Sequence, residues 1–219
     1  MGGATVSLSS TLFFIAEIIG TVAFALSGTM TGLRYKLDLF GVLFLAVVTA
    51  LGGGCTRDII LGRVPPAMFQ DYRYLLAAVA TSAIVFLAAL FGKTTYHRYE
   101  ERLASFANIT DAIGLGSFVV VGMNAGINAG YGDNGFFLVF LGLITCIGGG
   151  LLRDVFVVRM SGVLHKHVYA LPCILGGVLY LILTRLRVSE LLSIPVVIVF
   201  IFTFRMLATK YHWNLPHAE

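Results

Sequence analysis

The chain has 219 residues, of which 58% are hydrophobic and only 12% charged, and its mean hydropathy is +0.92. These values exclude a soluble globular domain and indicate an integral membrane protein. The formal net charge of +4 is informative mainly through its distribution among the loops, and we expect no nucleic-acid partner.

Seven apolar stretches follow one another along the chain, each of roughly the length that a helix needs to cross a bilayer. They cover residues 12–33, 38–61, 71–92, 108–129, 134–158, 167–185 and 189–208. The first is too long for the core of a cleaved signal peptide, so we expect it to be retained. The sequence therefore predicts an all-α, polytopic membrane protein with seven transmembrane helices in a single transmembrane domain, residues 1–219.

The fifth stretch repeats a motif of the second. LGGGCTRDIILGR at 51–63 and IGGGLLRDVFVVR at 147–159 share the glycine triplet, the Arg-Asp pair and the final arginine. A similar shift places Glu17 on Asp111 in the preceding stretches. Residues 12–92 therefore repeat as 108–185. Because each copy has three spans, the second copy must be inverted in the membrane, and the seventh helix, 189–208, has no counterpart.

Three contiguous glycines are costly in a membrane helix, at roughly 1 kcal/mol each relative to alanine. We expect the triplets to break the second and fifth helices beside a polar cavity, because lipid cannot satisfy unwound backbone. The predicted pore and kink residues are Gly52, Gly53, Gly54, Gly148, Gly149 and Gly150, with the hydroxyls of Thr49 and Thr145. The alternative is close helix packing, which we expect instead for spaced glycines such as Gly28 and Gly32.

Arg57 and Arg153 lie within apolar spans, where an unpaired charge costs at least about 2.5–3.5 kcal/mol. Each needs an acidic partner. From matching depths along the spans, we expect Glu17 to pair with Arg57 and Asp111 with Arg153. Such pairs would be either structural braces or elements of gating and selectivity, and the sequence leaves both roles open.

Asp58 and Asp154 directly follow the two arginines. Successive helical residues point about 100° apart, so we expect these acids not to pair with their neighbours. A position just after a helix break favours a capping role, since anions are stabilised at a helix N-terminus. The sequence predicts that they cap the second half of each broken helix.

No residue pattern indicates an enzyme or a tightly bound metal. The cysteines Cys55, Cys146 and Cys173 form no CxxC pair, and the chain has no HExxH or GxSxG motif. We expect no catalytic residues and no cofactor.

The positive charges favour an extracytoplasmic N-terminus and a cytoplasmic C-terminus. In this orientation ten Lys or Arg residues fall on the cytoplasmic side and five on the other, as the positive-inside rule requires. We expect the lipid bilayer as the surroundings of the whole domain.

Two copies of GGGxxRD, an acidic residue in the helix before each, and GRVPPAMF after the first copy together resemble the prokaryotic trimeric intracellular cation (TRIC) channels. This resemblance implies a homotrimer in a prokaryotic inner membrane. It also implies a pore in each protomer that passes monovalent cations, chiefly K+, with Na+ as the second candidate. The family is also labelled as a glycine transporter domain, so the alternative is a secondary transporter of a small solute such as glycine.

Overall fold

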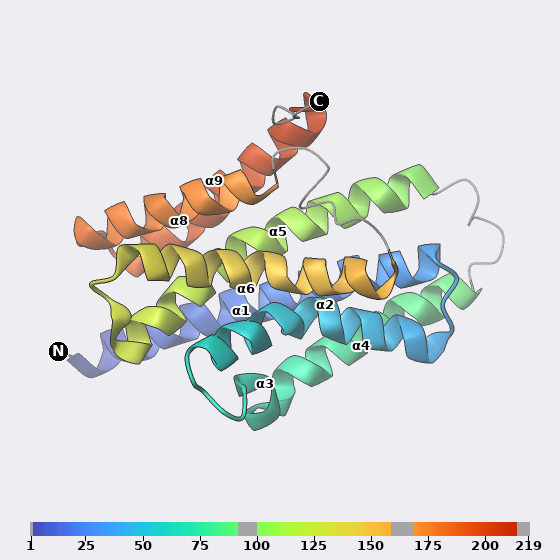
Figure 1. Ribbon diagram of the computed structural model, residues 1–219, viewed down its shortest axis with the longest axis horizontal. Coiled ribbons are helices and arrows are strands. Elements are labelled where there is room, and N and C mark those ends of the chain that lie inside the picture. Colours follow the sequence, from blue (N-terminus) through green and yellow to red (C-terminus); the bar gives the residue numbers. More distant parts are fainter. Residues whose placement is uncertain (1, 92–99, 159–168, 214–219) are drawn as a thin grey trace.

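The structure, a computed structural model, describes residues 2–91, 100–158 and 169–213, without the side chains of 2–8 and 100–105. All regular elements in these ranges are helical (Figure 1). They are α1 (Gly2–Arg34), α2 (Leu39–Ile60), α3 (Ala67–Gln70), α4 (Tyr72–Phe91), α5 (Glu100–Gly126), α6 (Gly135–Phe156), α8 (Ala170–Arg185) and α9 (Glu190–Lys210), with a π-helical turn at Ile127–Tyr131 after α5.

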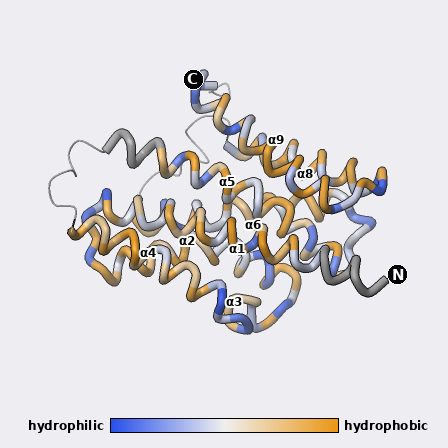
Figure 2. The backbone as a smooth tube through the Cα atoms, turned by 180° about the vertical axis from the view of Figure 1, so that it is seen from behind, coloured by the Kyte–Doolittle hydropathy of each residue, from blue (hydrophilic) through white to orange (hydrophobic). Residues whose placement is uncertain are grey.

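Six of these helices are long and apolar enough to cross a membrane, which confirms an all-α, multi-pass membrane protein. The exception among the larger helices is α8, whose 16 residues span about 24 Å, less than the hydrocarbon core of about 30 Å. The sixth predicted span therefore begins later than expected, and the seventh crossing stays a prediction. Figure 2 shows apolar colour along the long helices and polar colour mainly near their ends and around α3.

The two repeats pack against each other through reciprocal contacts. A Cβ added to Gly20 of α1 would lie 2.8 Å from the Phe118 ring of α5, and one added to Gly114 of α5 would lie 2.7 Å from the Phe24 ring of α1. The two phenylalanine rings are 5.2 Å apart. Since Gly20 and Phe24 correspond to Gly114 and Phe118 in the repeat, α1 and α5 run antiparallel about an approximate two-fold axis.

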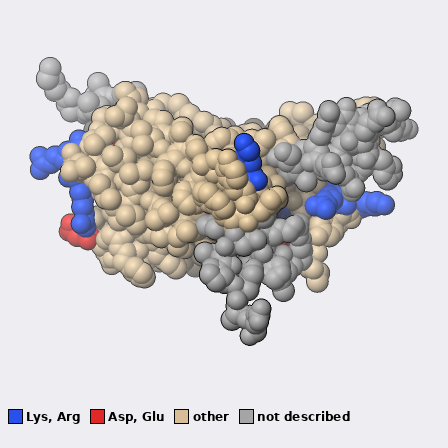
Figure 3. All heavy atoms as spheres, turned by 90° about the horizontal axis from the view of Figure 1, so that it is seen from above, with Lys and Arg blue, Asp and Glu red and all other residues tan. Residues whose placement is uncertain are grey.

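The unrepeated helix α9 packs on α5 and α8. Its buried face includes Val197, Ile201 and Arg205 at helical spacing. Gly116 of α5 allows a close approach, because its added Cβ would lie 3.0 Å from the Ile198 Cα. In Figure 3, most of the described surface on the face in view carries neither Lys or Arg nor Asp or Glu, as a lipid-facing surface requires.

Part of the predicted charge distribution lies outside the described residues. Lys93 and Arg98 fall in the first gap, and Arg159 and Lys166 fall in the second. The orientation in the membrane therefore stays a prediction.

Candidate functional site

The two glycine triplets meet where α2 crosses α6. A Cβ added to Gly53 would overlap the carbonyl oxygen of Thr145, and one added to Gly149 would overlap the carbonyl oxygen of Thr49. The added Cβ of Gly148 would be 3.1 Å from the Gly53 Cα. The antiparallel backbones of α2 and α6 are therefore in direct contact at this crossing, and the contact that Gly53 makes with α6 is equivalent to the one that Gly149 makes with α2.

Both helices remain helical through their triplets, Leu39–Ile60 and Gly135–Phe156. The expectation of broken helices is therefore wrong for this structure. The reason is that the missing side chains are used for backbone contact between helices, so the backbone can stay hydrogen-bonded within each helix. Contiguous glycines here serve the close packing that we expected only of spaced ones.

The third glycine of each triplet lies away from the crossing. A Cβ added to Gly54 would first meet Arg57 Nη2 at 3.7 Å, and one added to Gly150 would first meet Tyr169 Oη at 3.5 Å. These are ordinary van der Waals distances. Gly54 and Gly150 therefore adjoin the charged side chains and are not required for helix contact.

The threonines before the triplets occupy matching positions. Thr49 Oγ1 donates to the Leu45 carbonyl oxygen and Thr145 Oγ1 to that of Leu141, each at 2.6 Å. These hydroxyls lie against Gly28 of α1 and Gly122 of α5, whose added Cβ atoms would be 2.6 and 2.5 Å away. The close-packing role expected for Gly28 is confirmed, and its repeat counterpart behaves alike.

A first charge cluster lies beside the crossing and consists of Glu17, Arg57, Asp58 and Tyr74. Arg57 and Asp58 are 4% and 1% exposed. Arg57 pairs with Asp58, with Nη2 and Nε at 2.8 and 2.9 Å from Asp58 Oδ1. Glu17 instead accepts a hydrogen bond from Tyr74, with Oη 2.8 Å from Oε2.

The predicted Glu17–Arg57 pair is therefore replaced by a pair of sequence neighbours. The Cβ atoms of neighbouring helical residues do point apart, but the long arginine side chain can fold back to a carboxylate one residue away. Asp58 is also held in place, because its Oδ2 accepts a hydrogen bond from the Ala67 amide at 2.9 Å. Asp58 thus caps α3, not a second half of α2.

A small polar cavity adjoins this first cluster. It has a volume of about 30 Å³ and is lined by Glu17, Arg57, Asp58 and Tyr74 together with Gly54, Thr145 and apolar neighbours. Such a volume holds about one water molecule. The polar cavity expected beside a triplet is present at the first one, although the helix next to it is unbroken.

A second charge cluster, Asp111, Arg153, Asp154 and Tyr169, stands at the corresponding place in the other repeat. Arg153 Nε is 2.9 Å from Asp154 Oδ1, which repeats the Arg57–Asp58 pair. Arg153 Nη1 is also 3.5 Å from Asp111 Oδ1, so the predicted pair of these two residues is confirmed. Tyr169 Oη donates to Asp111 Oδ2 at 2.6 Å, as Tyr74 donates to Glu17.

Two further residues extend the second cluster. Ser27 of α1 contacts both charges, since its Oγ accepts from Arg153 Nη1 at 2.7 Å and lies 3.4 Å from Asp111 Oδ1. The Arg205 guanidinium of α9 lies 4.4 Å from the centre of the Tyr169 ring, within cation–π range. The second cluster therefore also involves two further helices, α1 and α9, and a second arginine.

The sequence reasoning missed these aromatic and polar partners. Glu17 and Asp111 are 94 residues apart, and Arg57 and Arg153 are 96 apart. Tyr74 and Tyr169 are 95 residues apart, so the repeat indicates that the two tyrosines occupy equivalent positions. Ser27 and Arg205 had none, because neither has an equivalent in the other repeat.

The comparisons with known proteins agree with this architecture. The family model described as "Glycine transporter" matches residues 14–89 and 108–185. A UPF0126 membrane protein of Vibrio cholerae is 34% identical over 96% of this chain and 84% of its own. The UPF0126 inner membrane protein YadS of Escherichia coli is 33% identical over 94% of this chain and 95% of its own.

Solved structures of similar fold are cation channels. A prokaryotic TRIC channel crystallised in 0.5 M KCl has a TM-score of 0.83 and 33% identity, over 94% of this chain and all of that one. The TRIC orthologue of Rhodobacter sphaeroides has a TM-score of 0.81 and 25% identity, over 92% and 98%. The chain is thus a multi-pass membrane protein that belongs to the TRIC family, whose family model carries the glycine transporter description.

Proposed function

We propose that the chain is a passive channel for monovalent cations, with K+ as the main permeant ion and Na+ as the second candidate. The path would lie within each protomer, past the α2–α6 crossing. The support comes from structural relatives that are TRIC cation channels, one of them crystallised in KCl. We further propose a homotrimer with the N-terminus outside and the C-terminus in the cytoplasm.

The observation that carries this proposal is the pair of buried charge clusters on either side of the crossing. Three acidic side chains, Asp58, Asp111 and Asp154, are buried, and Glu17 is half-buried, in a protein whose outer surface suits lipid. Buried charges of this kind in membrane proteins mark ion pathways. In the first cluster two carboxylates face one arginine, an excess that favours cations over anions. Gly54 and Thr145 line the cavity there.

The alternative, transport of a small solute such as glycine, is favoured by the description of the family model. The cavity argues against it, because about 30 Å³ suits one water and is too small for glycine with its carboxylate and ammonium groups. A dehydrated cation is a better match in size. The cavity wall also combines carboxylate and hydroxyl oxygens, the ligand type that hard cations prefer.

The test is single-channel recording of the purified protein in a planar bilayer. We expect unitary current steps in KCl that reverse near the K+ equilibrium potential under a KCl gradient. Glu17→Gln should lower the unitary current, because it removes a negative charge from the cavity wall. Saturable glycine uptake into liposomes without unitary currents would overturn the proposal. Arg73→Gln, a change at an exposed residue at the start of α4, serves as the matched control.

A further inference from the structure

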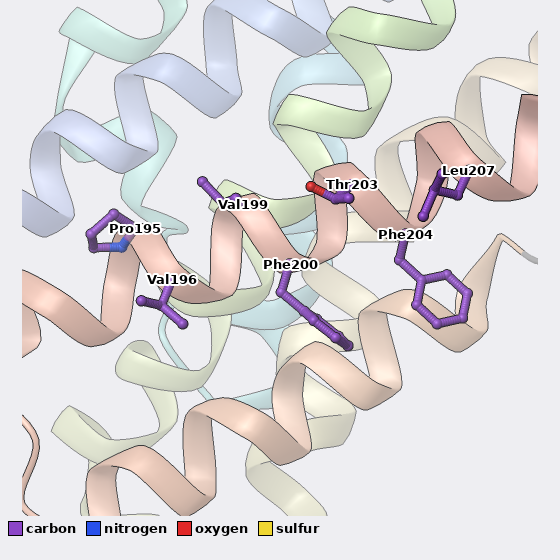
Figure 4. A pocket seen from close by; sticks show the side chains of 7 residues that line it. All are labelled: Pro195, Val196, Val199, Phe200, Thr203, Phe204 and Leu207. Atoms are coloured by element: carbon purple, nitrogen blue, oxygen red, sulfur yellow. The ribbon is translucent and has the colours of Figure 1, made fainter.

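An apolar groove runs along α9, where Val196, Val199 and Leu207 are exposed. It has a volume of about 560 Å³, and all the residues that line it belong to α9. Figure 4 shows them in close-up. One row consists of Pro195, Val199, Thr203 and Leu207, and the other of Val196, Phe200 and Phe204.

The groove has the shape that residue spacing on a helix produces. Side chains four residues apart form a ridge, and two neighbouring ridges enclose a channel between them. Phe200 and Phe204 stand out on one side of the helix, and the smaller Val199 and Thr203 lie on the other (Figure 4). The groove is therefore narrow, apolar and parallel to the helix axis.

The length of the groove fits one leaflet of a bilayer. From Pro195 to Leu207 the helix rises about 18 Å at 1.5 Å per residue. Half of a hydrocarbon core of about 30 Å is about 15 Å. An acyl chain from the leaflet at the Lys210 end would thus reach about ten residues along α9 and fill the groove from Phe200 to Leu207.

One end of the groove carries groups typical of the membrane surface. Trp213 lies edge-on to Phe204 with ring centres 5.7 Å apart, and Tyr211 stacks on Trp213 at 6.2 Å. Lys210 Nζ is 5.6 Å from the centre of the Tyr211 ring. Trp and Tyr concentrate at headgroup level. The acidic residue of this helix, Glu190, is at the opposite end, so the Lys210 end attracts anions.

We propose that this groove binds a phospholipid with an anionic headgroup. The acyl chain lies between the two rows of α9, and the headgroup lies beside Lys210, Tyr211 and Trp213. The site goes beyond the proposed channel function and does not depend on it. It is also separate from the charge clusters, because Arg205, the α9 residue that contacts the second cluster, is buried and does not line the groove.

The chain offers its own probe, because Trp213 is its only tryptophan. The protein is reconstituted in vesicles of phosphatidylcholine with increasing amounts of phosphatidylglycerol that is brominated on its acyl chains. Brominated phosphatidylcholine serves as the comparison. We expect quenching of Trp213 fluorescence to favour phosphatidylglycerol about fivefold, the selectivity that one cation near an anionic headgroup supplies.

Two variants separate the parts of the site. Lys210→Gln should abolish the preference for phosphatidylglycerol and leave the quenching by phosphatidylcholine unchanged. Thr203→Phe fills the groove and should lower quenching by both lipids. Ile84→Phe, on the lipid-facing side of α4 and 67% exposed in the wild type, is the matched control and should change neither.

Two outcomes would overturn the proposal. Equal quenching by both brominated lipids in proportion to their amounts would mean that the groove contacts only bulk lipid. Weak quenching by both lipids, together with disulfide cross-linking of Val199→Cys between protomers, would assign the groove to a second copy of the chain. Elution of each variant at the wild-type volume in size-exclusion chromatography verifies that it has folded.

Discussion

The two charge clusters have the same plan but different surroundings. In each, an arginine near the end of α2 or α6 pairs with the next aspartate, and a tyrosine donates to an acid on α1 or α5. The first cluster borders a water-sized cavity. The second is contacted by Ser27 of α1 and by Arg205 of α9. The repeat therefore preserves backbone contacts and ion pairs, while Ser27 and Arg205 add partners to the second cluster that have no counterpart in the first.

The largest expected effect tests the part that the two halves share. Gly53→Ala and Gly149→Ala should each destabilise the protein by about 3 kcal/mol, since the new methyl group overlaps a backbone oxygen that cannot move aside. Gly54→Ala and Gly150→Ala should be neutral within about 1 kcal/mol, because they have space and gain helix propensity. Denaturant titration in detergent measures the four free energies of unfolding.

If the third glycines proved as sensitive as the second ones, the triplets would act through backbone flexibility and not through the crossing. A large difference between Gly53→Ala and Gly149→Ala would break the symmetry that the reciprocal contacts imply.

The next effect should separate the two clusters. Asp111→Asn removes a charge that faces Arg153, Ser27 and Tyr169, and should cost about 3 kcal/mol because a buried arginine loses a partner. Glu17→Gln should cost about 1 kcal/mol, since the amide oxygen still accepts from Tyr74. The same denaturant titration checks both. Equal losses would contradict the difference between an acid that pairs with an arginine, Asp111, and one that bonds to a tyrosine, Glu17.

A smaller difference is expected between the tyrosines. Tyr169→Phe should destabilise by about 2 kcal/mol, because it leaves a buried carboxylate without a hydrogen bond of 2.6 Å. Tyr74→Phe should cost about 1 kcal/mol, as Glu17 borders a cavity where water can replace the hydroxyl. Thermal unfolding in detergent, compared at equal protein concentration, ranks the two. A reversed order would contradict the deeper burial of Asp111 relative to Glu17.

The smallest structural change should affect permeation alone. Thr145 lines the cavity, whereas Thr49, its repeat counterpart, does not. Both hydroxyls bond within their own helix, so replacement by valine should change stability by about 1 kcal/mol or less. We expect Thr145→Val to reduce K+ current in planar bilayers and Thr49→Val to leave it unchanged. Equal reductions would argue for a path that uses both halves alike.

The helices and their inverted repeat were predictable because hydropathy and a duplicated motif are properties of the sequence itself. The Asp111–Arg153 pair followed from depth in the membrane. The continuous helices at the triplets did not, since a glycine that bends a helix and one that admits a neighbouring backbone look the same in sequence. The Arg57–Asp58 pair was not predicted for two reasons. The arginine side chain is long enough to reach the carboxylate of its neighbour, and the Ala67 amide holds that carboxylate in place by a hydrogen bond.

The reciprocal crossing also has a consequence for the order of assembly during synthesis. Gly53 of α2 packs against the carbonyl group of Thr145, which belongs to α6. This contact exists only after α6 is in place. The three helices of the first repeat can insert into the membrane on their own. The close contact at Gly53, however, cannot form until α6 of the second repeat has been synthesised. The final packing of α2 must therefore await α6, and the two halves of this protein lock together in a single late step.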